Sequence, residues 1–285
     1  MSVAIVRLRD ASMRFDTRVL FEHLDLDVAP GEFLAVLGPN GSGKTTLLRI
    51  LLGLTRMSSG DVEIDGRAPR RGSHDVGYVP QQRAFDRDLP IRGRDLVRFG
   101  LDGHRRGLPF GTARSRARVD DAIASVGAER YADAPIGLLS GGEQQRLRIA
   151  QALIGDPKVL LCDEPLLSLD FAHQQAVSEL IDARRRDCGT AVVFVTHEIN
   201  PILPYVDRVL YLVGGRWAVG TPDEVLTSAG LSDLYGTDID VLNLRGRIIV
   251  VGSDDTAPTE PGGHHHHHHD HSHDDQHHRA RTEWR

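Results

Sequence analysis

Short runs of consecutive apolar residues recur along this chain: FLAVL at 33–37, VLLC at 159–162 and AVVFV at 191–195. Uninterrupted runs of this length are typical of strands buried on both faces, as in a parallel sheet covered by helices. The first run is soon followed by TLLRILLGL at 46–54, whose leucines and isoleucine would cover a helix. The pattern therefore predicts an α/β fold in which a buried strand leads through a short loop into a helix.

A second helix is predicted within LLSGGEQQRLRIAQAL, at 138–153. Ser140 is a suitable N-cap for it, and Glu143 three residues later would complete a capping box. Further along, the segment 215–236 is expected to form a strand followed by short helices. The segment 239–252 has two β-rich halves around an Arg-Gly pair, which predicts a hairpin packed on the core.

The composition changes beyond Gly252. Residues 253–263 are polar and rich in proline and glycine, which is typical of a linker, and the low-complexity remainder is expected to be disordered without metal. No apolar stretch approaches the roughly 18 residues that cross a bilayer, and the N-terminus has no hydrophobic signal region. We therefore expect a cytosolic chain with no membrane span of its own.

Hydrophobic residues make up 40% and charged residues 26% of the 285, as in an ordinary globular protein. The formal net charge of the chain is −6. Seven acidic residues and three arginines follow position 253 and contribute −4, which leaves about −2 for the rest of the chain. A near-neutral body argues against a nucleic-acid partner, which needs a basic surplus. The two cysteines, Cys162 and Cys188, provide no disulfide framework.

The most specific signal is GPNGSGKTT, which stands between the apolar strand at 33–37 and the predicted helix. Its glycines let the backbone curl so that N–H groups face a phosphate, and the helix N-terminus adds positive potential. Lys44 would neutralise the β- and γ-phosphates of ATP, and the Thr45 hydroxyl would ligate Mg²⁺. The predicted nucleotide-binding residues of this loop are Gly38, Pro39, Asn40, Gly41, Ser42, Gly43, Lys44, Thr45 and Thr46.

Two carboxylates end the apolar run at 159–165. A buried strand delivers them at its carboxyl edge, beside the phosphate loop of the same parallel sheet. Asp163 would hold Mg²⁺ through water, and Glu164 would act as the general base for the attacking water. Two acids are needed because the carboxylate beside the metal ion is held by its charge, which leaves the other to accept the proton.

The segment LSGGE before QQR, with the phosphate loop upstream and LLCDEP downstream, resembles the ATP-binding subunit of ABC transporters. The resemblance runs from about Val6 to Gly236. It implies an ABC ATP-binding domain at 1–236, with an antiparallel β subdomain and an inserted helical subdomain at about 82–150. A C-terminal β extension at 237–252 and a disordered, His-rich tail at 253–285 complete the predicted organisation.

The resemblance implies roles for further residues. Phe15 matches the aromatic that stacks on adenine, where the family more often has tyrosine. Gln81 matches the glutamine that senses Mg²⁺ and the γ-phosphate; Gln82 adjoins it, but alignment on GYVPQ favours Gln81. His197 matches the switch histidine at the γ-phosphate. The signature motif and the interface-crossing segment imply further nucleotide contacts from Ser140, Gly141, Gly142, Glu143 and Asp170.

The resemblance also implies partners. In this family the signature segment of one copy closes on the ATP held by another, which implies a homodimer. One set of motifs without membrane spans implies separate permease subunits, and hence a peripheral position on the cytoplasmic face of the cell membrane. For an importer, an extracytoplasmic binding protein would deliver the solute through the permease.

The stretches 81–100 and 196–212 look like the branch that imports zinc and manganese. Zinc is the favoured cargo and manganese the second, while iron chelates, vitamin B12 or another small solute stay open. A soluble ABC ATPase of DNA repair or translation is a further alternative. Such proteins usually carry two cassettes or long inserted arms, and this chain has neither.

The C-terminal segment holds ten of the fifteen histidines, interleaved with aspartates. Residues follow the six consecutive histidines, so a native segment is a better interpretation than a purification tag. Neutral imidazoles ligate Zn²⁺ and hold Mn²⁺ poorly, which favours zinc as the cargo. A zinc buffer, a zinc sensor that damps the ATPase, and a neutral tail all remain open. The candidate zinc ligands are His264, His265, His266, His267, His268, His269, His271, His273, His277 and His278.

Overall fold

The computed structural model describes residues 4–81, 85–102 and 112–252. The predicted disordered tail with its ten histidines lies outside these residues, and so does Gln82.

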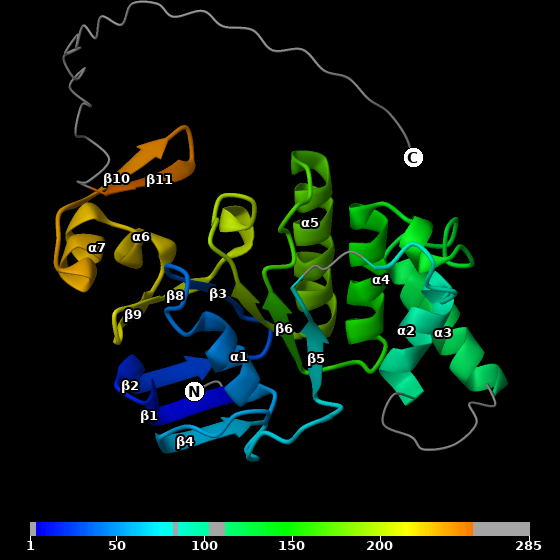
Figure 1. Ribbon diagram of the computed structural model, residues 1–285, viewed down its shortest axis with the longest axis horizontal. Coiled ribbons are helices and arrows are strands. Elements are labelled where there is room, and N and C mark those ends of the chain that lie inside the picture. Colours follow the sequence, from blue (N-terminus) through cyan, green and yellow to red (C-terminus); the bar gives the residue numbers. More distant parts are fainter. Residues whose placement is uncertain (1–3, 82–84, 103–111, 253–285) are drawn as a thin grey trace, which may run out of the picture. The chain divides into compact units, whose positions relative to one another are not determined.

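A six-stranded sheet forms the centre of the fold, and the predicted α/β class is confirmed (Figure 1). The first five strands run parallel to one another, and the last is antiparallel to its neighbour. In sheet order they are β5 (Val76–Val79), β6 (Val159–Asp163), β7 (Ala191–Val195), β3 (Phe33–Leu37), β8 (Arg208–Val213) and β9 (Arg216–Gly220).

Both faces of this sheet are buried, which explains the uninterrupted apolar runs. In β3, Leu34 and Val36 belong to one hydrophobic cluster. Phe33, Ala35 and Leu37 belong to the other. The first cluster includes α1 (Lys44–Leu51) and a three-stranded antiparallel sheet. That sheet has the order β2 (Arg18–Val28), β1 (Val6–Phe15) and β4 (Ser59–Ile64).

Helices cover the other face. The helices are α2 (Gly93–Asp102), α3 (Ala113–Ser125), α4 (Gly141–Leu153) and α5 (Phe171–Cys188), with a short 3₁₀ turn η1 (Ile136–Leu138) before α4. The predicted capping box of α4 is confirmed. The Glu143 backbone N–H donates to Ser140 Oγ at 3.3 Å, and Glu143 Oε2 accepts the Ser140 N–H at 2.8 Å.

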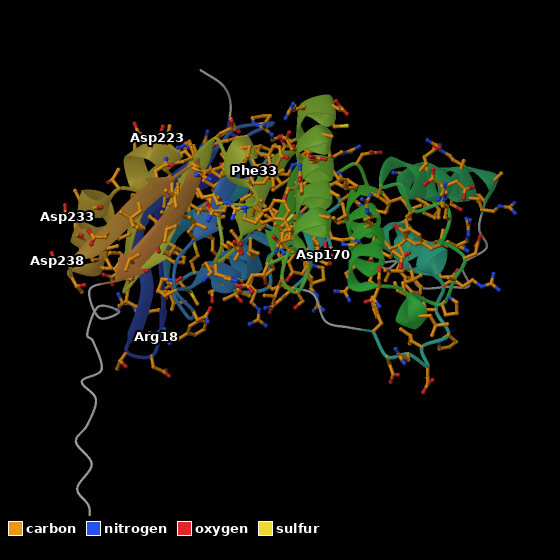
Figure 2. All side chains as sticks on the ribbon, turned by 90° about the horizontal axis from the view of Figure 1, so that it is seen from above. Arg18, Phe33, Asp170, Asp223, Asp233 and Asp238 are labelled. Carbon is orange, nitrogen blue, oxygen red and sulfur yellow. The ribbon has the colours of Figure 1, made fainter. Side chains whose placement is uncertain are left out.

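The last described residues, 203–252, form the C-terminal part of the structure. A 3₁₀ turn η2 (Leu203–Tyr205) precedes β8, and after β9 come α6 (Pro222–Val225), α7 (Ser228–Tyr235), β10 (Ile239–Leu244) and β11 (Arg247–Gly252). The last two strands pair antiparallel, so the predicted hairpin is present. It is tied to α7 because Ser232 Oγ accepts the Ile239 N–H at 2.8 Å. Figure 2 shows Asp223, Asp233 and Asp238 at the outer side of this part, well away from the core residue Phe33.

No helix within the described ranges is both long and apolar enough to cross a membrane.

The pair Phe33–Phe194 offers a test of the core. The two rings stack with centroids 5.5 Å apart, and both are fully buried. We expect Phe194→Ala to lower the free energy of unfolding by about 3–5 kcal/mol, because it removes packing and leaves a cavity. Phe99→Ala is the matched control, since its ring is about half exposed, and should cost less than about 1 kcal/mol. Urea unfolding measures both, and equal losses would contradict this assignment of the core.

Candidate active site

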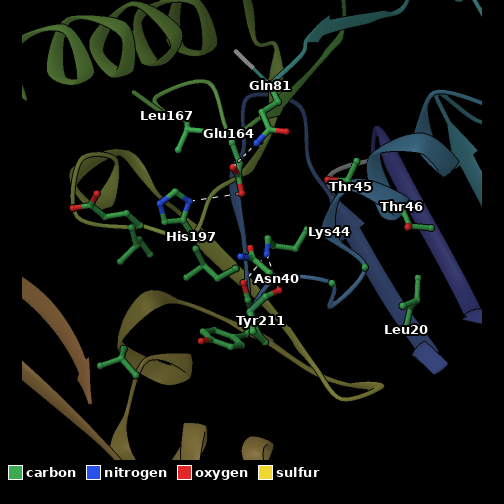
Figure 3. Close-up of a pocket in the computed structure, with 18 of the residues that line it drawn as sticks. Leu20, Asn40, Lys44, Thr45, Thr46, Gln81, Glu164, Leu167, His197 and Tyr211 are labelled. Atoms are coloured by element: carbon green, nitrogen blue, oxygen red, sulfur yellow. Dashed lines mark hydrogen bonds and ion pairs between the residues drawn. The ribbon is translucent and has the colours of Figure 1, made fainter. Parts of the chain in front are cut away.

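The order of the strands decides which loops meet. Gln81 follows β5, Glu164 follows β6, His197 follows β7, and the glycine-rich loop at 38–43 follows β3. Parallel strands present their carboxyl ends at one edge of the sheet, where ligands of such folds bind. These four segments therefore line a single pocket of about 1060 Å³ (Figure 3).

The glycine-rich loop can only be built with glycine at its first position. Gly38 has φ 138°, and a Cβ placed there would lie 2.0 Å from the carbonyl oxygen of Leu212. At the other end, Gly43 caps α1 with φ 107°. Only glycine adopts such backbone angles at little cost, so the loop can curl tightly against β8.

Lys44 lies under this loop and is almost completely buried. Its ammonium group donates to the carbonyl oxygens of Gly38 at 2.6 Å and Pro39 at 2.9 Å. Burial lowers the pKa of Lys44, while the negative charges of Glu164 and Asp163 oppose that shift. The lysine is therefore a fixed donor whose third N–H can be directed at an anion.

Ser42 is the one predicted residue of this loop that does not line the pocket. Its Oγ is buried and has no hydrogen-bond partner among the described residues. An unsatisfied buried hydroxyl costs free energy unless a bound group satisfies it. Lys44 and the glycines of the loop line the pocket, and these residues fit a nucleotide phosphate.

Thr45 and Asp163 bring two oxygens together behind the loop. Thr45 Oγ1 donates to Asp163 Oδ1 at 3.2 Å, and Tyr78 OH lies 3.4 Å from Asp163 Oδ2. Burial raises the pKa of Asp163, and burial together with the charge of Asp163 raises the pKa of Tyr78 to about 12. Hydroxyl and carboxylate oxygens are the ligands that Mg²⁺ prefers, so this pair fits a magnesium ion.

Glu164 occupies a strained position at the end of β6. Its φ is 46°, in the left-handed region, which costs roughly 1–3 kcal/mol for a non-glycine residue. Its backbone N–H donates to Val195 O at 2.9 Å, which anchors it to the neighbouring strand. The carboxylate lies between two side chains: Gln81 Nε2 donates to Oε2 at 3.0 Å, and His197 Nδ1 lies 3.7 Å from Oε1 (Figure 3). The fold thus aims one carboxylate into the pocket.

Phe15, at the end of β1, also lines the pocket and is 51% exposed. Three residues that the sequence analysis missed lie beside these groups. Arg18 donates to Gly41 O at 2.7 Å, Tyr78 contacts Asp163, and Asn200 follows His197 in the pocket wall. Tyr78 lies within GYVPQ and Arg18 is only three residues from Phe15, but neither position carried a chemical signal by itself.

The remaining predicted nucleotide contacts do not line this pocket. Ser140 begins α4, with Gly141, Gly142 and Glu143 in its first turn, and Asp170 caps α5 by accepting the His173 N–H at 2.9 Å. The two segments are close to each other, since a Cβ on Gly142 would meet the His173 ring at 2.2 Å. Within one copy of the chain, the structure does not bring these residues to the phosphate loop.

A glycine-rich phosphate loop after β3, a buried lysine and two acids at the end of β6 in the same parallel sheet define a P-loop nucleotide-binding protein. The family model "ABC transporter" matches residues 21–167, and the chain belongs to this family as one of its ATPases.

Relatives within the family carry different cargo names. The zinc import ATP-binding protein ZnuC of Halorhodospira halophila is 36% identical over 82% of this chain and 84% of its own. The manganese transport system ATP-binding protein MntB of Halalkalibacterium halodurans is 29% identical over 87% of this chain and 98% of its own. The spermidine/putrescine import ATP-binding protein PotA of Oleidesulfovibrio alaskensis is 38% identical over 78% of this chain and 59% of its own.

Among solved structures, a chain described as part of a metal-chelate type ABC transporter in an inward-facing conformation is similar. It superposes with a TM-score of 0.74 and is 26% identical, covering 87% of this chain and 96% of that one.

Gly38 provides a direct test of the phosphate loop. Gly38→Ala should weaken ATP binding by more than about tenfold, because the added Cβ would force the loop away from Leu212. Gly66→Ala is the matched control, since Gly66 also has a positive φ of 68° but a Cβ added there would meet no atom within 4 Å. Titration with a fluorescent ATP analogue measures both, and equal affinities would contradict the role of the loop.

Proposed function

We propose that this chain is the ATP-hydrolysing subunit of a membrane importer for a divalent metal, with zinc the first candidate and manganese the second. The observation that carries hydrolysis is the Glu164 carboxylate held between Gln81 and His197 at the mouth of the phosphate loop. The proposed metal cargo is inferred from the names of the zinc and manganese relatives and from the sequence patterns at 81–100 and 196–212.

In the proposed mechanism the phosphate loop and Lys44 bind the phosphates of ATP, and Phe15 stacks on the base. Thr45 and Asp163 would hold Mg²⁺ with Gln81 nearby, and the bound ion would neutralise charge on the phosphates. Glu164 accepts a proton from the attacking water. The water oxygen forms a bond to the γ-phosphorus while the bond between that phosphorus and the leaving ADP oxygen breaks. Gln81 and His197 keep the carboxylate aimed, which is the positioning that phosphoryl transfer needs.

Transport requires partners beyond this chain. A second copy would supply Ser140, Gly141, Gly142, Glu143 and Asp170 to the ATP held by the first. ATP binding would close this dimer and hydrolysis would open it, which is a two-state switch that can drive permease subunits. The chain would then lie on the cytoplasmic face of the membrane, with an extracytoplasmic metal-binding protein feeding the permease and no nucleic acid involved.

The His-rich segment supports zinc through its chemistry. No group of three or more histidines, cysteines or acids suited to a metal occurs within the described ranges, so zinc binding outside the permease would rest on the histidines at 264–278. Neutral imidazoles bind Zn²⁺, and their protonation near pH ~6.5 would release it.

Two alternatives keep the same ATPase. One is an importer of another solute such as an iron chelate, and the polyamine relative illustrates that high identity in the motor is compatible with a different cargo. The other is a soluble ABC ATPase outside transport. Co-purification with a polytopic membrane protein would separate the transporter from the soluble enzyme.

The role of Glu164 can be measured in turnover. Glu164→Gln should still bind ATP but hydrolyse it roughly 10²–10⁴-fold more slowly, because the amide cannot accept the proton. Glu198→Gln changes a neighbouring exposed carboxylate of the same pocket and should leave turnover largely unaltered. Phosphate release under saturating ATP checks both, and wild-type turnover in Glu164→Gln would rule out this residue as the base.

The cargo can be measured in cells grown under metal limitation. Strains would carry the wild type, Glu164→Gln, or a chain truncated after Pro261. We expect the Gln variant to lose cellular zinc and to keep its manganese, whereas the truncated chain shows whether the histidines tune uptake. Unchanged levels of both metals in the Gln variant would remove the metal cargo and leave an ABC ATPase with another solute.

A further inference from the structure

The C-terminal hairpin forms part of the wall of the nucleotide pocket. Ile248 and Val250 of β11 line the same pocket as Lys44 and His197. The hairpin lies far from these residues in the sequence, since Ile248 lies 51 residues after His197. Specific contacts must therefore hold the hairpin at the pocket.

Asn200 holds β11 by two hydrogen bonds. Its Nδ2 donates to the carbonyl oxygen of Ile248 at 2.9 Å, and its Oδ1 accepts the Ile248 N–H at 2.8 Å. This is the pattern that a neighbouring strand would make. Because Ile248 directs both backbone groups at Asn200, they point away from β10, and Asn200 occupies the open edge of the hairpin.

Asn200 also lies three residues beyond His197, in the segment between β7 and η2. The loop at 196–200 begins at the end of β7, where Thr196 Oγ1 donates to Glu198 O at 2.9 Å and accepts the Glu198 N–H at 3.1 Å. One end of the loop is thus fixed by the sheet and the other by the hairpin. His197 lies between these fixed points, 3.7 Å from Glu164.

A second contact joins the hairpin to α5. The Arg247 guanidinium lies 5.9 Å from the centre of the Phe171 ring, in cation–π range. Phe171 directly follows Asp170 at the start of α5. The hairpin therefore braces two segments that the proposed mechanism uses.

We propose that Asn200 is a positioning residue for ATP hydrolysis: its two bonds to β11 fix the loop that holds His197 against Glu164. The inference rests on the proposed role of His197. ATP itself is held by the phosphate loop, so losing the Asn200 clamp should affect turnover and spare ATP affinity.

Asn200→Leu removes both bonds and keeps the size of the side chain. We expect kcat to fall about 5- to 50-fold, which corresponds to two net hydrogen bonds, with KM for ATP changed less than about threefold. Asn243→Leu is the matched control. Asn243 lies in the same hairpin, and its side chain accepts the Gly246 N–H of the hairpin's own turn at 3.2 Å, so kcat should persist. An unchanged kcat in Asn200→Leu would overturn the proposal.

Ile248→Pro tests the clamp from the other side. Proline removes the N–H that Asn200 accepts, and a proline is tolerated on a strand edge whose N–H lies outside the ladder. Ile248→Pro should lower kcat as well. The double variant with Asn200→Leu should have a kcat little below that of Asn200→Leu alone, because both changes disrupt the same contact. If the fold-losses in kcat of the two single variants multiplied in the double variant, the proposal would be overturned. It would also be overturned if the variants lost thermal stability and ATP affinity along with kcat.

His197→Ala distinguishes failure of this inference from failure of the proposed mechanism. If Asn200 acts through His197, adding Asn200→Leu to His197→Ala should leave kcat almost unchanged. A further full loss would show that Asn200 acts by another route. Wild-type kcat in His197→Ala alone would instead overturn the role of His197, and with it the basis of the clamp.

Discussion

The parallel pairing of β6, β7 and β3 is the constraint on which the site depends. It brings three loops from distant parts of the sequence to one edge, in the order Glu164, His197 and the phosphate loop. A slip of one residue in β6 would reverse which side chains enter each hydrophobic cluster, so the buried alternation fixes the register. The position of the reactive carboxylate therefore follows from how the core packs.

This packing also stabilises unfavourable local conformations. Glu164 has a left-handed backbone, and Lys44 and Asp163 are charged groups held away from water. Burial lowers the pKa of Lys44 and raises that of Asp163, so in both residues it opposes the charged form. Such features are typical of sites that are organised before their ligand binds, because groups already in place need no rearrangement during the reaction.

Much of the fold could be predicted from local sequence, since the three apolar runs form β3, β6 and β7 as expected. Their order in the sheet could not be predicted, because periodicity reports the burial of a strand and says nothing of its neighbours. The phosphate loop at 38–44 was found because adjacent residues with fixed spacing carry its function. Tyr78 beside Asp163 and Asn200 beside Ile248 depend instead on contacts 85 and 48 residues away in the chain, which no local pattern reports.

The distribution of these features separates the motor from its cargo. The phosphate loop, Glu164 and His197 act on ATP, and nothing in their chemistry depends on the transported solute, so a polyamine relative can be as similar as a zinc relative. Features that distinguish this chain must then lie at the surfaces that meet other proteins or beyond the shared motor. Because β11 binds Asn200 and ends at Gly252, the hairpin links the loop of His197 to the point in the sequence where the histidine-rich segment follows.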